Sequence, residues 1–123
     1  MNNFKPYLLR AAYEWIEDSE LTPYILVDCR IESVDVPKDY IENNKIVLNI
    51  ASVAIDKLSL GNDFIKFFAR FDKISEKIVI PIDAVLSIYA IENKEGIWFD
   101  EEVVKEIKKP KIKKEKPNLT LLD

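Results

Sequence analysis

The sequence predicts a mainly β fold, in which one N-terminal α-helix packs on a small β-barrel. Apolar residues recur at helical spacing near the N-terminus alone. From residue 24 to residue 99, short runs rich in β-branched and aromatic residues follow one another at intervals too short to hold helices. Such closely spaced strands are typical of small barrels rather than of sheets that alternate with helices. A chain of 123 residues fits one domain of this kind.

The helix is expected over residues 6–18. Pro6 suits its first turn, because the first amide groups of a helix have no intrahelical partner and proline has no amide hydrogen. An apolar stripe recurs at helical spacing and consists of Leu8, Ala12, Trp15 and Ile16. Pro23 then ends the pattern, because the residue before a proline favours extended backbone.

Six or seven strands are expected after the helix. They fall on residues 24–29, 45–51, 55–60, 64–71, 77–80, 85–91 and 97–99. The tripeptide Gly61-Asn62-Asp63 favours a turn between two of them. Trp98 and Phe99 are expected to close the core. Periodicity does not decide which face of strands 45–51 and 64–71 lines the core, because both faces are largely apolar.

Residues 100–123 differ in composition from the body. Residues 100–115 are rich in lysine and contain Pro110, so they predict a flexible tether that buries too little apolar surface to offset its ordering entropy. Residues 116–123 include Leu119, Leu121 and Leu122, and large aliphatics on such an end are typical of a peptide that docks on a partner. Folding of these leucines back onto the body is the alternative interpretation of the tail alone.

Charge is divided unevenly along the chain. The body is acidic and the tether is basic, and the whole chain has a net charge of −4 at neutral pH. An acidic body argues against nucleic-acid binding by the barrel, because phosphate contacts need clustered cations. The lysine-rich tether leaves weak RNA binding open.

The residue inventory excludes most catalytic chemistry. The absence of histidine removes Ser-His-Asp and Cys-His nucleophiles, and a single cysteine without histidine does not supply the ligands of a zinc site. Gly61 and Gly96 are the only glycines, too few for a phosphate-binding loop. We therefore expect no enzymatic activity, metal or cofactor, although composition alone leaves a paired-carboxylate or Mg²⁺ site open.

The single cysteine and the lengths of the apolar runs indicate where in the cell the protein is expected. As the sole cysteine, Cys29 forms no intrachain disulfide, and its place in an apolar strand predicts a buried, unreactive thiol. The sequence shows neither a signal peptide nor a run of ~20 apolar residues that would span a membrane. These features predict a soluble, cytoplasmic protein.

Several segments together resemble one known family, the stringent starvation protein B (SspB) adaptors that enhance the specificity of the ClpXP protease. The matching segments are Lys5-Pro6-Tyr7-Leu8-Leu9-Arg10-Ala11 with Tyr13-Glu14-Trp15, Val36-Pro37 with Tyr40, Ile46-Val47-Leu48-Asn49-Ile50-Ala51, and Ala69-Arg70-Phe71. The resemblance covers residues 5–99 and resumes over residues 116–123. Asp72-Lys73 stands where the family usually has a glycine pair, and the tether is shorter and more basic than is typical.

The resemblance implies a fold, a set of partners and no catalysis. In that family an Sm-like barrel forms a homodimer through its N-terminal helix. A groove on each barrel binds the ssrA degradation tag that the tmRNA system adds to stalled polypeptides. A C-terminal peptide docks on the N-terminal domain of the unfoldase ClpX, so the family delivers substrates and does not react with them.

Three sets of residues are then expected to make these contacts. The dimer interface falls on Tyr7, Leu8, Ala11, Ala12 and Trp15. The tag-binding groove falls on Asn49, Ala51, Phe67, Ala69, Arg70 and Phe71. The unfoldase-docking peptide falls on Lys116, Pro117, Leu119, Leu121 and Leu122. The chain accordingly divides into a tag-binding and dimerisation domain (1–99), a tether (100–115) and a docking peptide (116–123). Tyr40 is expected as a strand-edge aromatic packed on the barrel.

The leading hypothesis is therefore a dimeric, non-enzymatic adaptor for tagged proteins. The alternative is a small-barrel RNA-binding protein, since related barrels bind RNA and the tether is basic. Salt separates the two, because RNA binding through lysines falls steeply with salt whereas peptide binding tolerates it. A third interpretation, a plain structural subunit, predicts that removal of residues 116–123 changes nothing.

Overall fold

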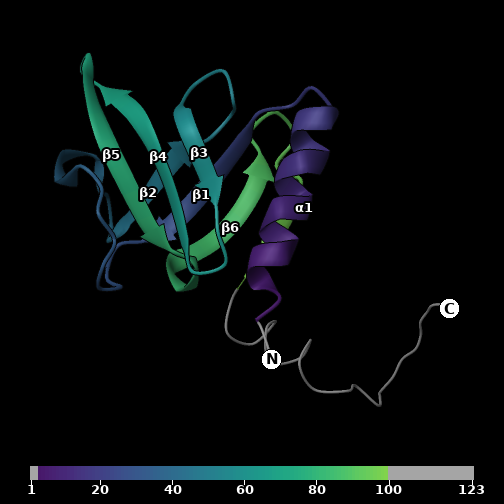
Figure 1. The fold of residues 1–123 in the computed structure, drawn as a ribbon, viewed down its shortest axis with the longest axis horizontal. Coiled ribbons are helices and arrows are strands. Elements are labelled where there is room, and N and C mark those ends of the chain that lie inside the picture. The colour runs from purple at the N-terminus through teal and green to yellow at the C-terminus, as the bar shows by residue number, and fades with distance from the viewer. Residues whose placement is uncertain (1–2, 100–123) are drawn as a thin grey trace, which may run out of the picture.

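A computed structural model of the chain describes residues 3–99 (Figure 1). The order of elements is α1 (Lys5–Asp18), β1 (Pro23–Asp28), the 3₁₀ turn η1 (Lys38–Tyr40), β2 (Lys45–Asn49), β3 (Asp56–Leu60), β4 (Phe64–Phe71), β5 (Ile74–Pro81), the 3₁₀ turn η2 (Ile82–Ala84), β6 (Val85–Ala90) and β7 (Gly96–Trp98). The expected tether (100–115) and docking peptide (116–123) lie outside the described residues.

The strands form two antiparallel sheets. One sheet has the order β2-β1-β6-β7 and the other the order β3-β4-β5. Within residues 3–99 the two sheets do not close into one continuous barrel, although a bridge between Asp35 and Val79 ties the segment after β1 to β5, with backbone N–O distances of 2.8 and 3.1 Å. The expected mainly β fold with one N-terminal helix is confirmed, and its strands are arranged as two partly wrapped sheets.

The core draws on both sheets and on the helix. Ile25 and Val27 of β1, Ile65 and Phe67 of β4, and Ile88 of β6 are at most 1 % exposed. These residues alternate along their strands, so one face of each sheet is apolar and buried while the other face carries most of the charge. Figure 1 shows α1 lying beside the end of the sandwich, and its nearest strands are β6, β1 and β3.

The helix ends at Asp18 as the sequence predicts and begins at Lys5, one residue earlier than expected, with Pro6 in its first turn. Its buried stripe is different, because Leu9, Ala12 and Ile16 pack into the core while Trp15 is 48 % exposed. Leu9, Ala12 and Ile16 are spaced by three and four residues, so they form a narrow apolar stripe along one side of the helix. Trp15, which the expected apolar stripe includes, lies on the outer side of the helix.

Most strand bounds differ from the expected ones by one or two residues, and the start of β5 differs most. β5 begins at Ile74 rather than at residue 77, and its first four residues are exposed, so their sequence carries no apolar alternation. Phe99 is buried as expected, and its amide donates to Leu86 O at 2.8 Å. Trp98 does not close the core. It is 57 % exposed and stacks on Tyr89, with ring centroids 6.4 Å apart and planes 3° apart.

Within residues 3–99, no helix combines the length and the apolar composition that crossing a membrane requires.

Candidate functional site

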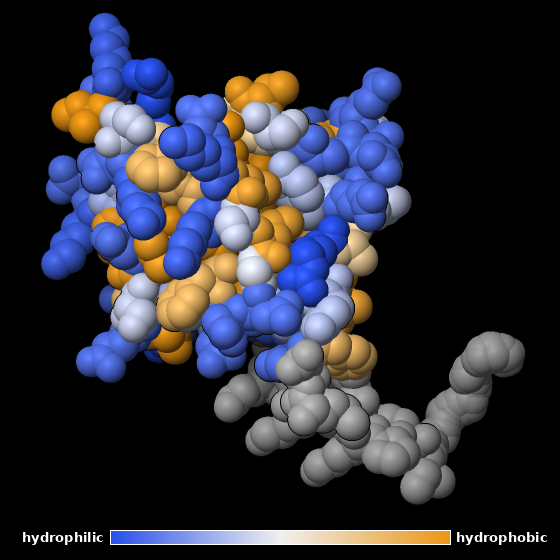
Figure 2. Space-filling view, in the orientation of Figure 1, coloured by the Kyte–Doolittle hydropathy of each residue, from blue (hydrophilic) through white to orange (hydrophobic). Residues whose placement is uncertain are grey.

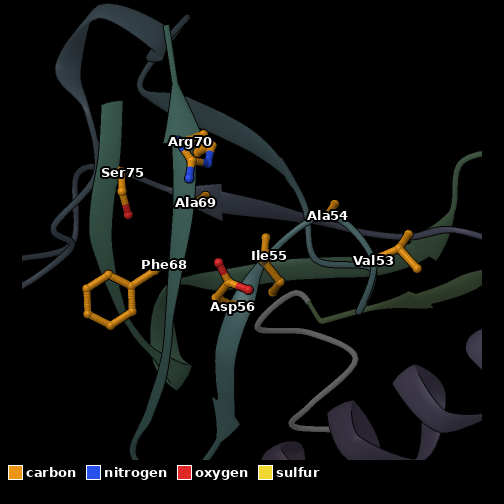
Figure 3. Close-up of a pocket in the computed structure, with 8 residues that line it drawn as sticks. All are labelled: Val53, Ala54, Ile55, Asp56, Phe68, Ala69, Arg70 and Ser75. Carbon is orange, nitrogen blue, oxygen red and sulfur yellow. The ribbon is translucent and has the colours of Figure 1, made fainter. Parts of the chain in front are cut away.

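A shallow groove of about 240 Å³ lies between the loop of residues 51–55 and the outer face of the β3-β4-β5 sheet (Figure 3). Its lining consists of Val53, Ala54, Ile55, Asp56, Phe68, Ala69, Arg70 and Ser75. A second hollow of about 280 Å³ continues the groove over Asp56, Lys57, Phe68 and Ser75. Figure 2 shows apolar side chains reaching the surface between charged ones on the face that contains these strands.

The groove exists because β3 stops pairing with β4 before β4 ends. The register runs Leu60–Ile65, Ser59–Lys66 and Asp56–Phe68, with an irregularity between Asp56 and Ser59. Lys57 lies inside that irregularity with a φ of 58°, which is the left-handed geometry of a bulge residue.

Beyond Phe68, β4 continues for three residues that are paired on one side. Ala69, Arg70 and Phe71 pair with Glu76, Ser75 and Ile74 of β5. Their other edge borders the groove, where β3 has diverged into the loop. An edge of this kind presents main-chain donors and acceptors to an extended peptide, which adds as a further strand.

The groove combines an apolar surface with charges of both signs. Phe68 is half-buried, and Lys57 Nζ lies 5.6 Å from the centre of its ring. Asp56 and Arg70 add a carboxylate and a guanidinium. Figure 3 shows Phe68 and Ser75 on one side of the hollow and Val53 on the other. Such a surface suits a peptide with both aromatic and charged side chains better than it suits a small polar metabolite.

The structure brings some of the expected groove residues together and places others elsewhere. Ala69 and Arg70 line the groove. Phe71, at the end of β4, packs on Tyr40, and Asn49 Oδ1 accepts a 2.9 Å hydrogen bond from the amide of Ala51. Asn49 therefore shapes the start of the groove loop without lining the groove itself.

Phe67 points into the core and is 1 % exposed. The aromatic side chain that lines the groove is that of Phe68. Sequence reasoning also missed the loop residues Val53 and Ala54. Neither residue has a periodic neighbour pattern that would signal a binding role. The one available signal was that Phe68 and Arg70 share a strand face.

The residues expected at the dimer interface fall into two groups. Tyr7 and Trp15 are 45 % and 48 % exposed, and Ala11, spaced four residues from each, is exposed between them. Leu8 is half-buried. Ala12 lies in the core of its own chain at 5 % exposure, so the structure assigns it to intrachain packing. The residues expected to dock on the unfoldase, 116–122, lie outside the described part of the chain.

Cys29, which directly follows β1, is a free and half-buried thiol. Burial, followed by the nearby charge of Asp28, raises the pKa of the Cys29 thiol. A thiol with a raised pKa is mostly protonated at neutral pH and is a poor nucleophile. Among residues 3–99, no three carboxylate or thiol side chains gather closely enough to hold a metal ion.

Comparison with known proteins assigns the chain to a family. The family model for stringent starvation protein B matches residues 3–120. A stringent starvation protein B homolog from Haemophilus influenzae is 46 % identical over 100 residues, which cover 81 % of this chain and 67 % of that protein. The match includes the helix, both sheets and the groove, and we conclude that the chain belongs to the stringent starvation protein B (SspB) family.

Proposed function

We propose that this protein is a non-enzymatic adaptor that binds ssrA-type degradation tags in the groove beside β4 and delivers the tagged proteins to the ClpXP protease. Membership in the SspB family supports the adaptor role. The observation that carries the proposal is the open edge of Ala69–Phe71, which borders a groove with an apolar surface and a cation. An extended peptide fits such an edge.

Each groove wall has a part in tag binding. The edge of β4 pairs with the main chain of the tag, and Phe68 offers an apolar surface to one of its side chains. Arg70 faces a tag carboxylate, and a guanidinium binds a carboxylate through two parallel hydrogen bonds. Asn49 holds the start of the loop through its bond to Ala51.

Delivery depends on a second contact in the same chain. Under the proposal, the sequence Lys116–Asp123 docks on the N-terminal domain of ClpX while the groove holds the tag. Two modest interactions joined by a tether act together, because the second one becomes intramolecular at roughly millimolar effective concentration. The adaptor therefore lowers the apparent KM of ClpXP for tagged proteins and carries out no chemistry itself.

The outer side of α1 provides the proposed homodimer contact. Tyr7, Ala11 and Trp15 form an exposed row on that side. A twofold dimer buries the same patch from each subunit, and small Ala11 lets two helices approach closely between the aromatic rings. A dimer carries two grooves and two tails, so it has avidity where both tails reach one unfoldase ring. We propose that it acts in the cytoplasm, where ClpXP meets stalled polypeptides.

A reporter degradation assay tests the adaptor function. A fluorescent protein that carries the host's tmRNA tag is degraded by ClpXP with no adaptor, with the full chain, or with a chain ending at Glu115. We expect the full chain to lower the apparent KM and the shortened chain to lose this effect. Fluorescence anisotropy with a labelled tag peptide should show equal binding by both chains.

Two results would contradict the proposal. The first is absence of tag-peptide binding by the full chain, especially if a labelled RNA oligomer binds with a steep salt dependence. The second is equal stimulation of degradation by the full and shortened chains, which would remove the docking role of residues 116–123.

A further inference from the structure

The carboxylate of Glu17 holds the groove loop at one residue. Ser52 N donates to Glu17 Oε2 at 2.9 Å, and Ser52 Oγ donates to Glu17 Oε1 at 2.9 Å. Glu17 lies in the last turn of α1, and Ser52 directly precedes the lining residues Val53 and Ala54. Both carboxylate oxygens are thus used on a single loop residue, which fixes its position in two directions.

Tyr13, one helical turn before Glu17, steadies the same carboxylate. Burial is the largest cause of the raised pKa of Tyr13. The charge of Glu17 and a hydrogen bond to Glu17 raise the pKa of Tyr13 further. Because Tyr13 and Glu17 are four residues apart, they lie on the same side of α1. Glu17 is therefore constrained from its own helix as well as from the loop.

A second side chain of the helix holds the far end of the same segment. Arg10 Nη1 donates to Leu60 O at 3.0 Å, and the Arg10 guanidinium lies 4.6 Å from the centre of the Tyr7 ring. Arg10 and Glu17 are seven residues apart, which is about two helical turns, so they project from the same side of α1. The segment from Ser52 to Leu60 is thus attached to α1 at both ends.

Residues 52–54, at the start of this segment, form an exposed wall of the groove. Ser52, Val53 and Ala54 are all exposed, and Val53 reaches 96 %. Within the loop, Ala54 N donates to Ala51 O at 2.9 Å, and Ile55 is the residue that returns to the core. A loop with few buried contacts opens easily, so its few anchoring bonds decide how long it keeps one shape.

We propose that Glu17 is a positioning residue for peptide binding, which fixes the loop wall of the groove by binding Ser52 through both carboxylate oxygens. This inference rests on the proposed tag-binding function. A groove already in its bound shape binds an extended peptide more tightly, because less loop entropy is lost on binding. Through this contact, the helix that carries the Tyr7, Ala11 and Trp15 row also sets the shape of the groove.

The binding experiment compares variants of the full chain by anisotropy with the labelled tag peptide. We expect Glu17→Ala to weaken binding by roughly three- to tenfold, as loss of charge-assisted bonds and of loop order predicts. Glu17→Gln should bind within about twofold of the wild type, because its amide accepts from Ser52 N and donates to Ser52 Oγ. Glu14→Ala is the matched control, since Glu14 is an exposed glutamate on the same helix.

Amide hydrogen exchange of the free protein gives a readout that needs no ligand. In Glu17→Ala, exchange should accelerate at Ser52 and across residues 53–55, while β6 and the buried side of α1 keep wild-type protection. In Glu17→Gln, protection at Ser52 should return. A general loss of helix stability would instead accelerate exchange along α1.

The outcomes separate this inference from the function on which it rests. If the wild type does not bind the tag, the proposed function fails, and the exchange data alone decide whether Glu17 orders the loop. If the wild type binds and Glu17→Ala binds equally well, the positioning role is overturned. Equal weakening by Glu17→Ala and Glu14→Ala, or unchanged exchange at Ser52, overturns it as well.

Discussion

The ring of Tyr40 lies 5.0 Å from the ring of Phe71, measured between centroids. Its hydroxyl donates a 2.8 Å hydrogen bond to Oδ2 of Asp72, and this bond, more than burial, raises the pKa of Tyr40. Tyr40 ends η1, Phe71 ends β4, and Asp72 begins the turn to β5. The contact joins the segment between β1 and β2 to the tip of the β4–β5 hairpin, next to the groove.

That hairpin turn stores backbone strain. Asp72 and Lys73 have φ values of 52° and 69°, the left-handed geometry that a two-residue hairpin turn needs and that glycine adopts most easily. Lys73→Gly should therefore raise the free energy of unfolding by about 1 kcal/mol. Lys77→Gly, inside β5, should lower it by roughly 0.5–1 kcal/mol. Urea denaturation measures both, and a destabilising Lys73→Gly would contradict the strain argument.

Phe67 and Phe68 should separate stability from binding. Phe67 is 1 % exposed in the core, so Phe67→Ala should lower the free energy of unfolding by about 3–5 kcal/mol. Phe68 is half-buried in the groove, so Phe68→Ala should cost less stability and weaken tag-peptide binding by roughly tenfold. Thermal unfolding and anisotropy make the comparison. Tag affinity that survives Phe68→Ala would remove this residue from the site.

Arg70 should set the salt dependence of tag binding. Arg70→Glu places a carboxylate against the tag carboxylates and should weaken binding by roughly tenfold or more. The affinity of the wild type should fall modestly between 0.05 and about 0.3 M salt, and Arg70→Ala should remove most of that slope. Lys66→Glu is the control, since Lys66 shares the outer face of β4 but lies outside the groove lining. Equal losses in Arg70→Glu and Lys66→Glu would indicate a general charge effect.

Trp15 should control self-association without affecting the fold. Because Trp15 is 48 % exposed on the outer side of α1, Trp15→Glu buries nothing new in the monomer but places two like charges at a twofold contact. We expect sedimentation equilibrium to show a dimer for the wild type and a monomer for Trp15→Glu at micromolar concentration. Lys77→Glu, an equally drastic change at an exposed site on β5, should remain dimeric. A wild-type monomer at that concentration would end the dimer proposal.

Protonation of Asp28 should make the free energy of unfolding depend on pH in acid. The side-chain hydrogen bonds of Arg30, at 3.0 Å, and its backbone amide hold the pKa of Asp28 below its ordinary value. A lowered carboxylate pKa contributes stability above the unfolded pKa of about 4 and loses it as pH falls through the folded value.

Asp28→Asn keeps an oxygen acceptor but removes the charge, so it should be modestly less stable than the wild type at pH 7. The gap should close below about pH 4, as the unfolded and then the folded carboxyl of the wild type take up protons. Thermal melts from pH 2.5 to 7 follow the gap. A gap that stays constant over this range would assign the effect to packing rather than to charge.

Local pattern alone predicted the elements of this chain with good bounds. The helix from Pro6 onward, the turn at Gly61 and the full length of β4 follow from spacing and turn chemistry that act over a few residues. Tyr7 and Trp15, which the family resemblance predicts at a dimer interface, are exposed, and the dimer itself stays a prediction. Local pattern did not decide which side of the helix meets the sheets, because apolar residues lie around much of its circumference, and Trp15 of the expected stripe lies on the outer side.

Only the tertiary structure decided which face of β4 is buried. A period of two shows that Phe67 and Ala69 share one face and that Phe68 and Arg70 share the other, but both faces are partly apolar. The partner sheet and the helix make the choice, since burial depends on what covers a face. Glu17 and Ser52 of the groove loop are 35 positions apart in the sequence, and Tyr40 and Phe71 have a similar sequence separation. No local pattern encodes contacts between residues so far apart.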